Sequence, residues 1–363
     1  MKSVRILALT KYGSKGASSR LRFLQYFGPL RINGLIIEHH ALLNDQILQL
    51  RYHAGKYLIT QLLKSYVSRI KTLLTSRHFD ILWIEKEALP WLPLWVEKLM
   101  ISGVPYVLDF DDATFHHYDS HRLDWVRKFY GSRIDGLMAN ATLVVGGNSY
   151  LNKRAQKANA PWVELLPTVI DLNRYSVEAF SKTREIDGLP RIVWIGSPST
   201  LRYLDLLSEP LQQLAMRVPF VLRVIGGQID MPGVQIETIN WTEASEVESI
   251  ATADVGVMPL FDSMWEKGKC GYKLIQYMAS GLPVVASPVG VNIEIVQNGI
   301  NGFLADKATD WLIALERLLT HPDLAAQMGQ AGRRRVESEY CLQIAAPKLV
   351  KFFKKIATDL SAN

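Results

Sequence analysis

The sequence predicts an α/β protein built from two successive Rossmann-like units of similar size. Short β-branched runs alternate with longer helical patterns, which is typical of a parallel sheet wound with helices. The length of 363 residues exceeds that of one ordinary domain. The alternation stops in the polar segment Pro167–Arg184, which shows neither periodicity. We interpret this segment as the connection between the units.

In the first half, short apolar runs are predicted as strands. They are Val4–Leu9, Gly34–His39, Ile81–Ile84, Tyr106–Asp109, Leu143–Gly146 and Trp162–Leu165. The helical patterns between them predict helices, chiefly Ser19–Arg31, Lys56–Ser76 and Tyr150–Ala158.

The second half repeats the same alternation. Its predicted strands are Arg191–Ile195, Val221–Ile225, Val234–Thr238, Val255–Met258 and Pro283–Ala286. Its predicted helices are Tyr203–Met216, Ala244–Ala251, Tyr272–Met278, Ile293–Gln297, Ala308–Leu319, Pro322–Glu339 and the basic amphipathic Gln343–Leu360.

Composition indicates a globular protein with a large core and a modest positive charge. Hydrophobic residues make up 48% and charged residues 21%, which excludes a disordered chain. The net charge of +6 favours phosphate-bearing ligands or an anionic membrane surface as partners, and argues against nucleic acid. Cys270 and Cys341 lie far apart without metal-type spacing, so we expect reduced thiols.

The N-terminal apolar run is too short for a signal peptide, and no stretch reaches the roughly 18–20 apolar residues of a membrane-spanning helix. We therefore expect a cytoplasmic protein, either free or lying against the inner face of the membrane.

The strongest local signal is the segment from Gly268 to Ser287, which reads as a lysine-bearing loop, a short helix and a turn into a buried strand. A glycine-containing loop that enters a helix N-terminus offers free N–H groups to a phosphate. Lys269 and Lys273 are four residues apart, one helical turn, so both could reach one diphosphate. The residues alone equally allow ordinary solvated lysines.

This segment, with its continuation to Leu304, resembles the donor-binding region of the retaining glycosyltransferase family 4, the group 1 glycosyltransferases. The match is dense over Val255–Tyr340 and looser over the N-terminal half. The resemblance implies two facing Rossmann-like domains with a deep cleft, residues 1–168 on the acceptor side and 169–342 on the donor side. Residues 343–363 would form a helix that packs back toward the first domain.

The resemblance also implies a UDP- or GDP-linked sugar donor, no cofactor and no required metal. Two glutamates common in the family are absent, because Gly268 and Gln276 occupy their positions. Gln276 can still hydrogen-bond a ribose hydroxyl. The role of the first glutamate is vacant or passes to Glu266 or Asp262.

The expected donor-binding residues lie around the predicted nucleotide site of the second half. They are Gly196, Ser197, Arg202, Lys269, Lys273, Gln276 and Asn292. Arg202, Lys269 and Lys273 would share the diphosphate, and the two lysines would neutralise charge on the leaving group.

In the first half, the strand at Tyr106–Asp109 ends in a cluster of acids, where ligands of open α/β sheets bind. Asp109 and Asp111 could together bind Mg²⁺, because carboxylate oxygens are ligands of this ion. The resemblance favours a metal-free role for Asp111 near the donor sugar, as a third catalytic residue beside the lysines. Helix capping by Asp111 or Asp112 is the plainer alternative.

The loop after the first strand resembles the family's flexible acceptor loop, with Ser19, Arg20 and Arg22 expected at the cleft. Two arginines at the start of a helix oppose its dipole, which a bound anion would explain. Ser19 could alternatively cap the helix.

The helix predicted within Lys56–Arg77 is basic and amphipathic. Its apolar stripe is Ile59, Leu62, Leu63, Tyr66, Val67, Ile70 and Leu74. We interpret the stripe as core-facing. Contact with anionic lipid, together with Trp91, Trp95 and the basic C-terminal helix, is the second interpretation.

These features predict a retaining hexosyltransferase that extends a glycan or lipid-linked acceptor in cell-surface polysaccharide or glycolipid synthesis. The alternative is a non-catalytic nucleotide-sugar-binding subunit that partners another glycosyltransferase.

Overall fold

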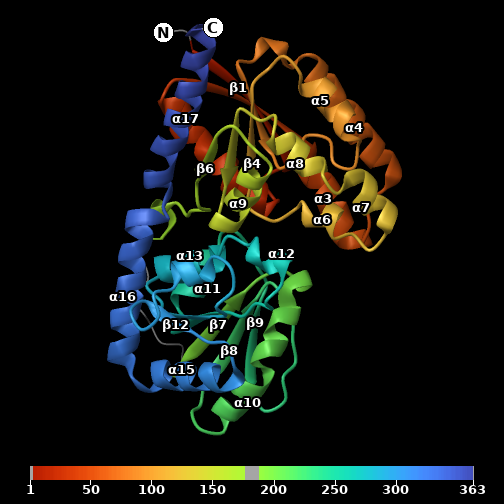
Figure 1. Ribbon diagram of the computed structural model, residues 1–363. Coiled ribbons are helices and arrows are strands. Elements are labelled where there is room, and N and C mark those ends of the chain that lie inside the picture. The colour runs from red at the N-terminus through yellow and green to blue at the C-terminus, as the bar shows by residue number, and fades with distance from the viewer. Residues whose placement is uncertain (1–2, 176–187, 363) are drawn as a thin grey trace. The chain divides into compact units, whose positions relative to one another are not determined.

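The computed structural model describes residues 3–175 and 188–362, so residues 176–184 of the predicted connection lie outside the described part (Figure 1). The chain divides into two compact units. The first comprises Met1–Thr168, Gly268–Cys270 and Leu342–Asn363, and the second comprises Val169–Lys267 and Gly271–Cys341. Each unit contains one parallel sheet, and the α/β class with two Rossmann-like sheets is confirmed.

Over the described residues, the first unit forms a six-stranded sheet with the order β2-β1-β3-β4-β5-β6. The strands are β1 (Val4–Tyr12), β2 (Leu35–Leu43), β3 (Ile81–Glu85), β4 (Tyr106–Phe110), β5 (Leu143–Gly146) and β6 (Val163–Leu165). The central strands β3 and β4 are buried along their whole length, as expected where helices cover both faces of a parallel sheet.

Helices of the first unit occupy both faces of this sheet. They are α1 (Ala17–Arg22), α2 (Phe27–Ile32), α3 (Asp45–Ala54), α4 (Ile59–Leu74), α5 (Leu94–Ile101), α6 (His116–Asp119), α7 (Asp124–Tyr130), α8 (Arg133–Met138), α9 (Ser149–Lys157) and α17 (Leu342–Ala362), with 3-10 turns η1 (Leu24–Tyr26) and η2 (Ser76–His78). The C-terminal helix α17 packs on this sheet, because Phe353 contacts the ring of Trp83 and Phe352 contacts that of Trp162.

The described part of the second unit forms another six-stranded parallel sheet, ordered β12-β11-β10-β7-β8-β9. Its strands are β7 (Arg191–Ile195), β8 (Val221–Ile225), β9 (Gln235–Ile239), β10 (Val255–Met258), β11 (Val284–Ala286) and β12 (Gly302–Leu304). Its helices are η3 (Leu172–Arg174), η5 (Pro198–Leu207), α10 (Ser208–Ala215), α11 (Glu246–Ala251), α12 (Met264–Lys267), α13 (Tyr272–Ala279), α14 (Asn292–Ile295), α15 (Ala308–Thr320) and α16 (Pro322–Glu339).

Two predicted helices are interrupted. The predicted helix Ser19–Arg31 is divided at Phe23, whose ψ of −66° and φ of −125° leave the helical region and whose ring stacks on buried Trp83. The predicted helix Tyr203–Met216 begins earlier, as the 3-10 segment η5 with Pro198 in its first turn. The packing of Phe23 sets the first boundary and Pro198 the second. Hydrophobic periodicity predicts neither of them.

The core-facing interpretation of the apolar stripe on α4 is wrong for most of that stripe. Ile59, Leu63, Val67 and Leu74 are exposed, whereas Tyr66 and Ile70 pack against the core. The buried residues of the helix are Ser65, Arg69 and Leu73. The Arg69 guanidinium donates to Thr10 O at 2.6 Å and to His40 O at 2.9 Å. These carbonyl acceptors compensate the burial of the Arg69 charge, so the side of α4 that carries Arg69 can face the interior of the unit.

None of the helices in the described ranges is both long enough and apolar enough to cross a membrane.

Candidate functional site

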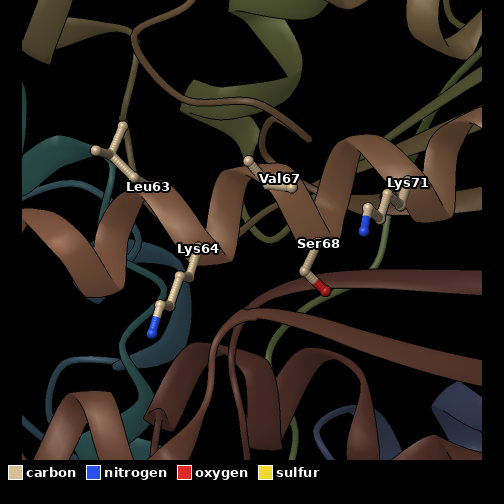
Figure 2. Close-up of a pocket in the computed structure, with 5 residues that line it drawn as sticks. All are labelled: Leu63, Lys64, Val67, Ser68 and Lys71. Atoms are coloured by element: carbon tan, nitrogen blue, oxygen red, sulfur yellow. The ribbon is translucent and has the colours of Figure 1, made fainter.

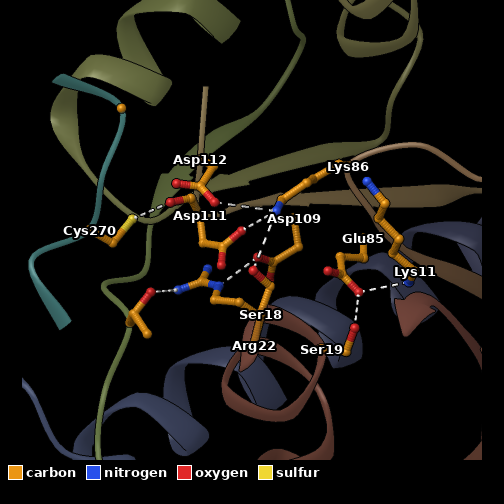
Figure 3. A network of polar contacts seen from close by, with 12 residues as sticks. Lys11, Ser18, Ser19, Arg22, Glu85, Lys86, Asp109, Asp111, Asp112 and Cys270 are labelled. Atoms are coloured by element: carbon orange, nitrogen blue, oxygen red, sulfur yellow. Dashed lines mark hydrogen bonds and ion pairs between the residues drawn. The ribbon is translucent and has the colours of Figure 1, made fainter. Parts of the chain in front are cut away.

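The first unit gathers charged side chains at the carboxyl ends of β1, β3 and β4 (Figure 3). Carboxyl ends of parallel strands meet at one edge, and this edge is where open α/β sheets bind ligands. Lys11 lies near the end of β1 and Glu85 is the last residue of β3. Lys86 comes directly after β3, and Asp111 and Asp112 directly after β4. The edge is therefore a candidate binding site built from strand termini.

Lys86 is the central cation of this edge, and its position was not predicted from the sequence. Its Nζ lies 2.7 Å from Asp111 Oδ1 and 3.8 Å from Asp112 Oδ2. The backbone of Lys86 has a φ of 63°, a left-handed conformation that costs a non-glycine residue about 1 kcal/mol or more. Such strain is typical of functional sites. The charged sequence Glu85-Lys86-Glu87 directly after an apolar strand was the available signal.

The two aspartates differ in their proton affinity. Burial opposes ionisation of Asp111, but the adjacent Lys86 ammonium outweighs it and lowers the pKa of Asp111. Burial and the charge of Asp111 raise the pKa of Asp112. An ionised carboxylate can accept hydrogen bonds from sugar hydroxyls.

Ser19 lies at this edge, but it does not cap a helix. Its Oγ donates to Glu85 Oε2 at 2.6 Å and accepts from Tyr12 N at 3.0 Å, while the backbone N–H of Lys11 also donates to Glu85 at 2.8 Å. The N-cap of α1 is Gly16. Ser19 is fully buried, so it holds the first loop against β3.

The electrostatic argument for an anion beside Arg20 and Arg22 is wrong. Helix α1 begins at Ala17, so both arginines fall in its last turn, where a cation is favourable. Arg22 is buried, and its Nε donates to Asp109 Oδ1 at 2.7 Å. Arg20 Nη1 donates to Ser14 O at 3.1 Å. Their predicted role toward an acceptor stays a prediction without this support.

The loop Gly268–Cys270 packs within the first unit. Asn148 Nδ2 donates to Gly268 O at 3.0 Å and to Lys269 O at 2.9 Å, and Cys270 Sγ donates to Asp111 O at 3.1 Å. A Cβ at position 268 would lie 2.4 Å from Ala113 Cβ. A side chain at position 268 would therefore require this loop or Ala113 to move.

Lys269 and Lys273 are not one helical turn apart on one helix, because α13 begins only at Tyr272. Lys269 lies close enough to Asp112 to favour its ionised form. Lys273 is in the first turn of α13, with its Nζ 4.6 Å from the ring centroid of Trp194 on β7. The shared-diphosphate geometry therefore does not follow from helical spacing.

In the second unit, Lys273 lies beside the carboxyl ends of the central strands. Gly196 and Ser197 follow β7, and a Cβ at Gly226 would lie 2.3 Å from Gly196 O, so the loops after β7 and β8 pass close together. Gly271, with a φ of 65°, caps α13, and Tyr277 of that helix accepts from Ile195 N at 3.0 Å. This edge offers backbone groups and a cation to a phosphate.

Arg202 is paired with the buried Glu266, a contact that no spacing rule predicts. Arg202 Nη2 lies 3.3 Å from Glu266 Oε1, and Tyr203 donates to the same oxygen at 2.7 Å. Glu266 is one of the two acids considered as a substitute for the missing glutamate. Here it orients an arginine whose side chain is 60% exposed.

Gln276 and Asn292 are both buried. Gln276 Nε2 donates to Tyr175 Oη at 3.3 Å, and Asn292 Nδ2 donates to Ser287 O at 3.0 Å. Among the described residues, no hydrogen-bond donor lies within reach of the buried Asn292 Oδ1. Donor contacts by these two residues stay predictions.

No group of three or more His, Cys, Asp or Glu is arranged to hold a metal ion within residues 3–175 and 188–362. Asp109, one member of the Mg²⁺ site considered above, is engaged by Arg22.

Residues 189–321 match the family model described as "Glycosyl transferases group 1". The D-inositol 3-phosphate glycosyltransferase of Pseudarthrobacter chlorophenolicus is 29% identical over 151 residues, which cover 41% of this chain and 35% of that relative. The phosphatidyl-myo-inositol mannosyltransferase of Mycobacterium leprae is 22% identical over 316 residues, or 80% of this chain and 78% of that protein.

Among solved structures, Anabaena HepE in complex with UDP and glucose shares this fold, with a TM-score of 0.71 at 15% identity over 97% of this chain and 100% of HepE. Apart from Gly268–Cys270, the family match falls within the second unit, on the segment that carries Gly196, Arg202 and Lys273. Residues 189–321 are therefore similar to the group 1 glycosyltransferases, and the relatives that match most of the chain are named as glycosyltransferases.

Proposed function

We propose that this chain is a retaining, metal-independent hexosyltransferase that uses a UDP- or GDP-linked sugar. The observation that carries the proposal is the edge of the second sheet, where Lys273 and the N-terminus of α13 lie beside the loop at Gly196. A lysine and free helix N–H groups supply the positive charge that a departing diphosphate requires. HepE, which shares the fold, was solved with UDP and glucose.

The acceptor in this proposal is a glycan or a lipid-linked glycan of cell-surface polysaccharide or glycolipid synthesis. The carboxylates Asp111 and Asp112, held by Lys86, suit the recognition of sugar hydroxyls. Two mycobacterial relatives are named for mannosyl transfer to phosphatidylinositol-type acceptors. Their names support the lipid-linked class for this chain.

The first experiment is a thermal-shift screen of UDP- and GDP-linked sugars, followed by assay of the stabilising donor with glycolipid extracts. Transfer with an α-linked product from an α-linked donor, read by the anomeric NMR coupling, is the expected result. An inverted product would refute retention. Stabilisation by a nucleotide sugar without hydrolysis or transfer would favour the alternative, a non-catalytic binding subunit. That alternative is suggested by Gly268 and Gln276, which stand where the resemblance expects glutamates.

A further inference from the structure

The outward side of α4 carries an apolar stripe that nothing in the described chain covers. Ile59, Leu63, Val67 and Leu74 are 74%, 62%, 52% and 64% exposed. At 100° per residue these four positions lie within about 80° of one another on the helix. Four aliphatic side chains aligned at such exposure on one helix form a contiguous patch, which in soluble proteins marks an interaction surface.

The chain around this stripe contains no acidic residue. Between Asp45 and Asp80, residues 46–79 include neither Asp nor Glu, although the average composition of the chain would place about three there. The same stretch holds six basic residues, of which all but the buried Arg69 are exposed. The exposed ones are Arg51, Lys56, Lys64, Lys71 and Arg77.

Helix α5 extends the same surface. It contacts α4, and the two helices lie side by side in Figure 1. Trp95 and Leu99 of α5 are 69% and 59% exposed, and Lys98 is exposed between them. The single acid of this helix, Glu97, is buried and bonded to Arg133 and to the backbone N–H of Ala88. Within the described helices α4 and α5, the exposed side chains are therefore apolar, polar or basic, and the one carboxylate, Glu97, is buried.

A shallow hollow of about 360 Å³ lies on this face (Figure 2). Leu63, Val67, Lys64, Lys71 and Ser68 line it. Lys64 and Lys71 are two turns apart, so both ammonium groups project from the same side of α4. Aliphatic groups beside paired ammonium groups match a phospholipid, in which a phosphate lies directly above acyl chains.

We propose that the α4–α5 face, defined by Ile59, Leu63, Val67, Leu74, Trp95 and Leu99 with Lys64, Lys71 and Lys98, docks on an anionic phospholipid bilayer. A second copy of the chain is a poorer occupant, because pairing this face with itself would bring like charges together. An anionic leaflet supplies the opposite charge, and each basic residue near it strengthens binding several-fold. The proposal does not depend on sugar transfer.

The test is co-sedimentation of the full chain with vesicles of phosphatidylcholine alone and of phosphatidylcholine mixed with phosphatidylglycerol, at low and at high salt. We expect binding to the mixed vesicles at low salt and its loss at high salt. Both Lys64→Gln with Lys71→Gln and Leu63→Gln with Val67→Gln should weaken binding roughly tenfold or more. Circular dichroism and Tm establish that the variants remain folded.

Ile313→Gln is the matched control, because Ile313 is 63% exposed on α15 of the second unit and Leu63 is 62% exposed. It should bind as the unmodified chain does. Absence of binding to phosphatidylglycerol vesicles at low salt would overturn the proposal, as would equal losses in the control. Dimerisation in size-exclusion chromatography that disappears in Leu63→Gln with Val67→Gln would assign the face to a second copy instead.

Discussion

Arg22 on α1 and Asp109 on β4, 87 residues apart in sequence, form a buried ion pair with 2.7 Å between Nε and Oδ1. The Arg22 guanidinium also donates to Leu166 O at 2.7 Å. These contacts join the first loop, the central strand and the end of the first unit's sheet. The pair is part of the framework that supports the charged edge, and a direct role in binding an acceptor is not needed to explain it.

Arg22→Met should lower the free energy of unfolding by about 3–5 kcal/mol, because it leaves the Asp109 carboxylate buried without its partner. The measurement is equilibrium denaturation followed by circular dichroism. Arg22→Met with Asp109→Leu removes both charges and should recover a large part of the loss. A single variant as stable as the unmodified chain would show that the pair does not hold this edge together.

Lys273→Ala should reduce kcat/KM for sugar transfer by an amount that corresponds to about 2–4 kcal/mol, because a charge-assisted contact to the leaving diphosphate is lost. The fold should persist, since Lys273 is half-buried in the first turn of α13, with its Nζ over the ring of Trp194. Lys267→Ala is the control, as Lys267 pairs with exposed Asp262 at 2.9 Å. Near-normal turnover by Lys273→Ala would exclude this lysine from the active site.

Stability of the first unit should fall as the pH drops below about 6.5. Burial, Arg69 and His39 lower the pKa of His40 to about 4 from an ordinary value of 6.5. Its Nδ1 accepts a hydrogen bond from Arg69 Nε at 3.0 Å, which requires a neutral ring. The unfolded chain then binds a proton that the folded chain excludes, so stability is complete above pH 6.5 and is lost toward pH 4.

Tm measured between pH 7.5 and pH 5 checks this dependence. His40→Gln keeps an acceptor for Arg69 without a titrating ring, so its Tm should change less over this range. His321→Gln, at an exposed position of the second unit, should leave the dependence unaltered. If His40→Gln and the unmodified chain gave parallel curves, another group would control the acid sensitivity.

Sugar transfer should continue in the presence of EDTA, and added Mg²⁺ should not accelerate it. The physical reason is that Lys273 and the N-terminus of α13 supply positive charge at the proposed diphosphate site. The measurement is the initial rate with and without chelator. Loss of activity in EDTA with recovery in Mg²⁺ or Mn²⁺ would instead assign a metal to the first unit's aspartates.

The sequence by itself determined the class of fold and most of its strands. Strands β5, β7, β8 and β10 begin and end at the predicted residues, because buried parallel strands are short apolar runs bounded by turns. The helix Pro322–Glu339 is also confirmed at both ends, with proline in its first turn. Local chemistry is sufficient for such elements, since their own residues decide where they start and stop.

Only the tertiary structure decided which charges meet. Lys86 faces Asp111, Arg22 faces Asp109, and Arg69 on the buried side of α4 donates to Thr10 O and His40 O. None of these contacts has a sequence spacing that predicts it. Each partner comes from a different strand or helix, and a buried charge is stable only where distant groups satisfy it. The exposure of the other side of α4 is a further consequence. With Arg69 hydrogen-bonded inside the unit, Ile59 and Leu63 lie on the outward side of the helix.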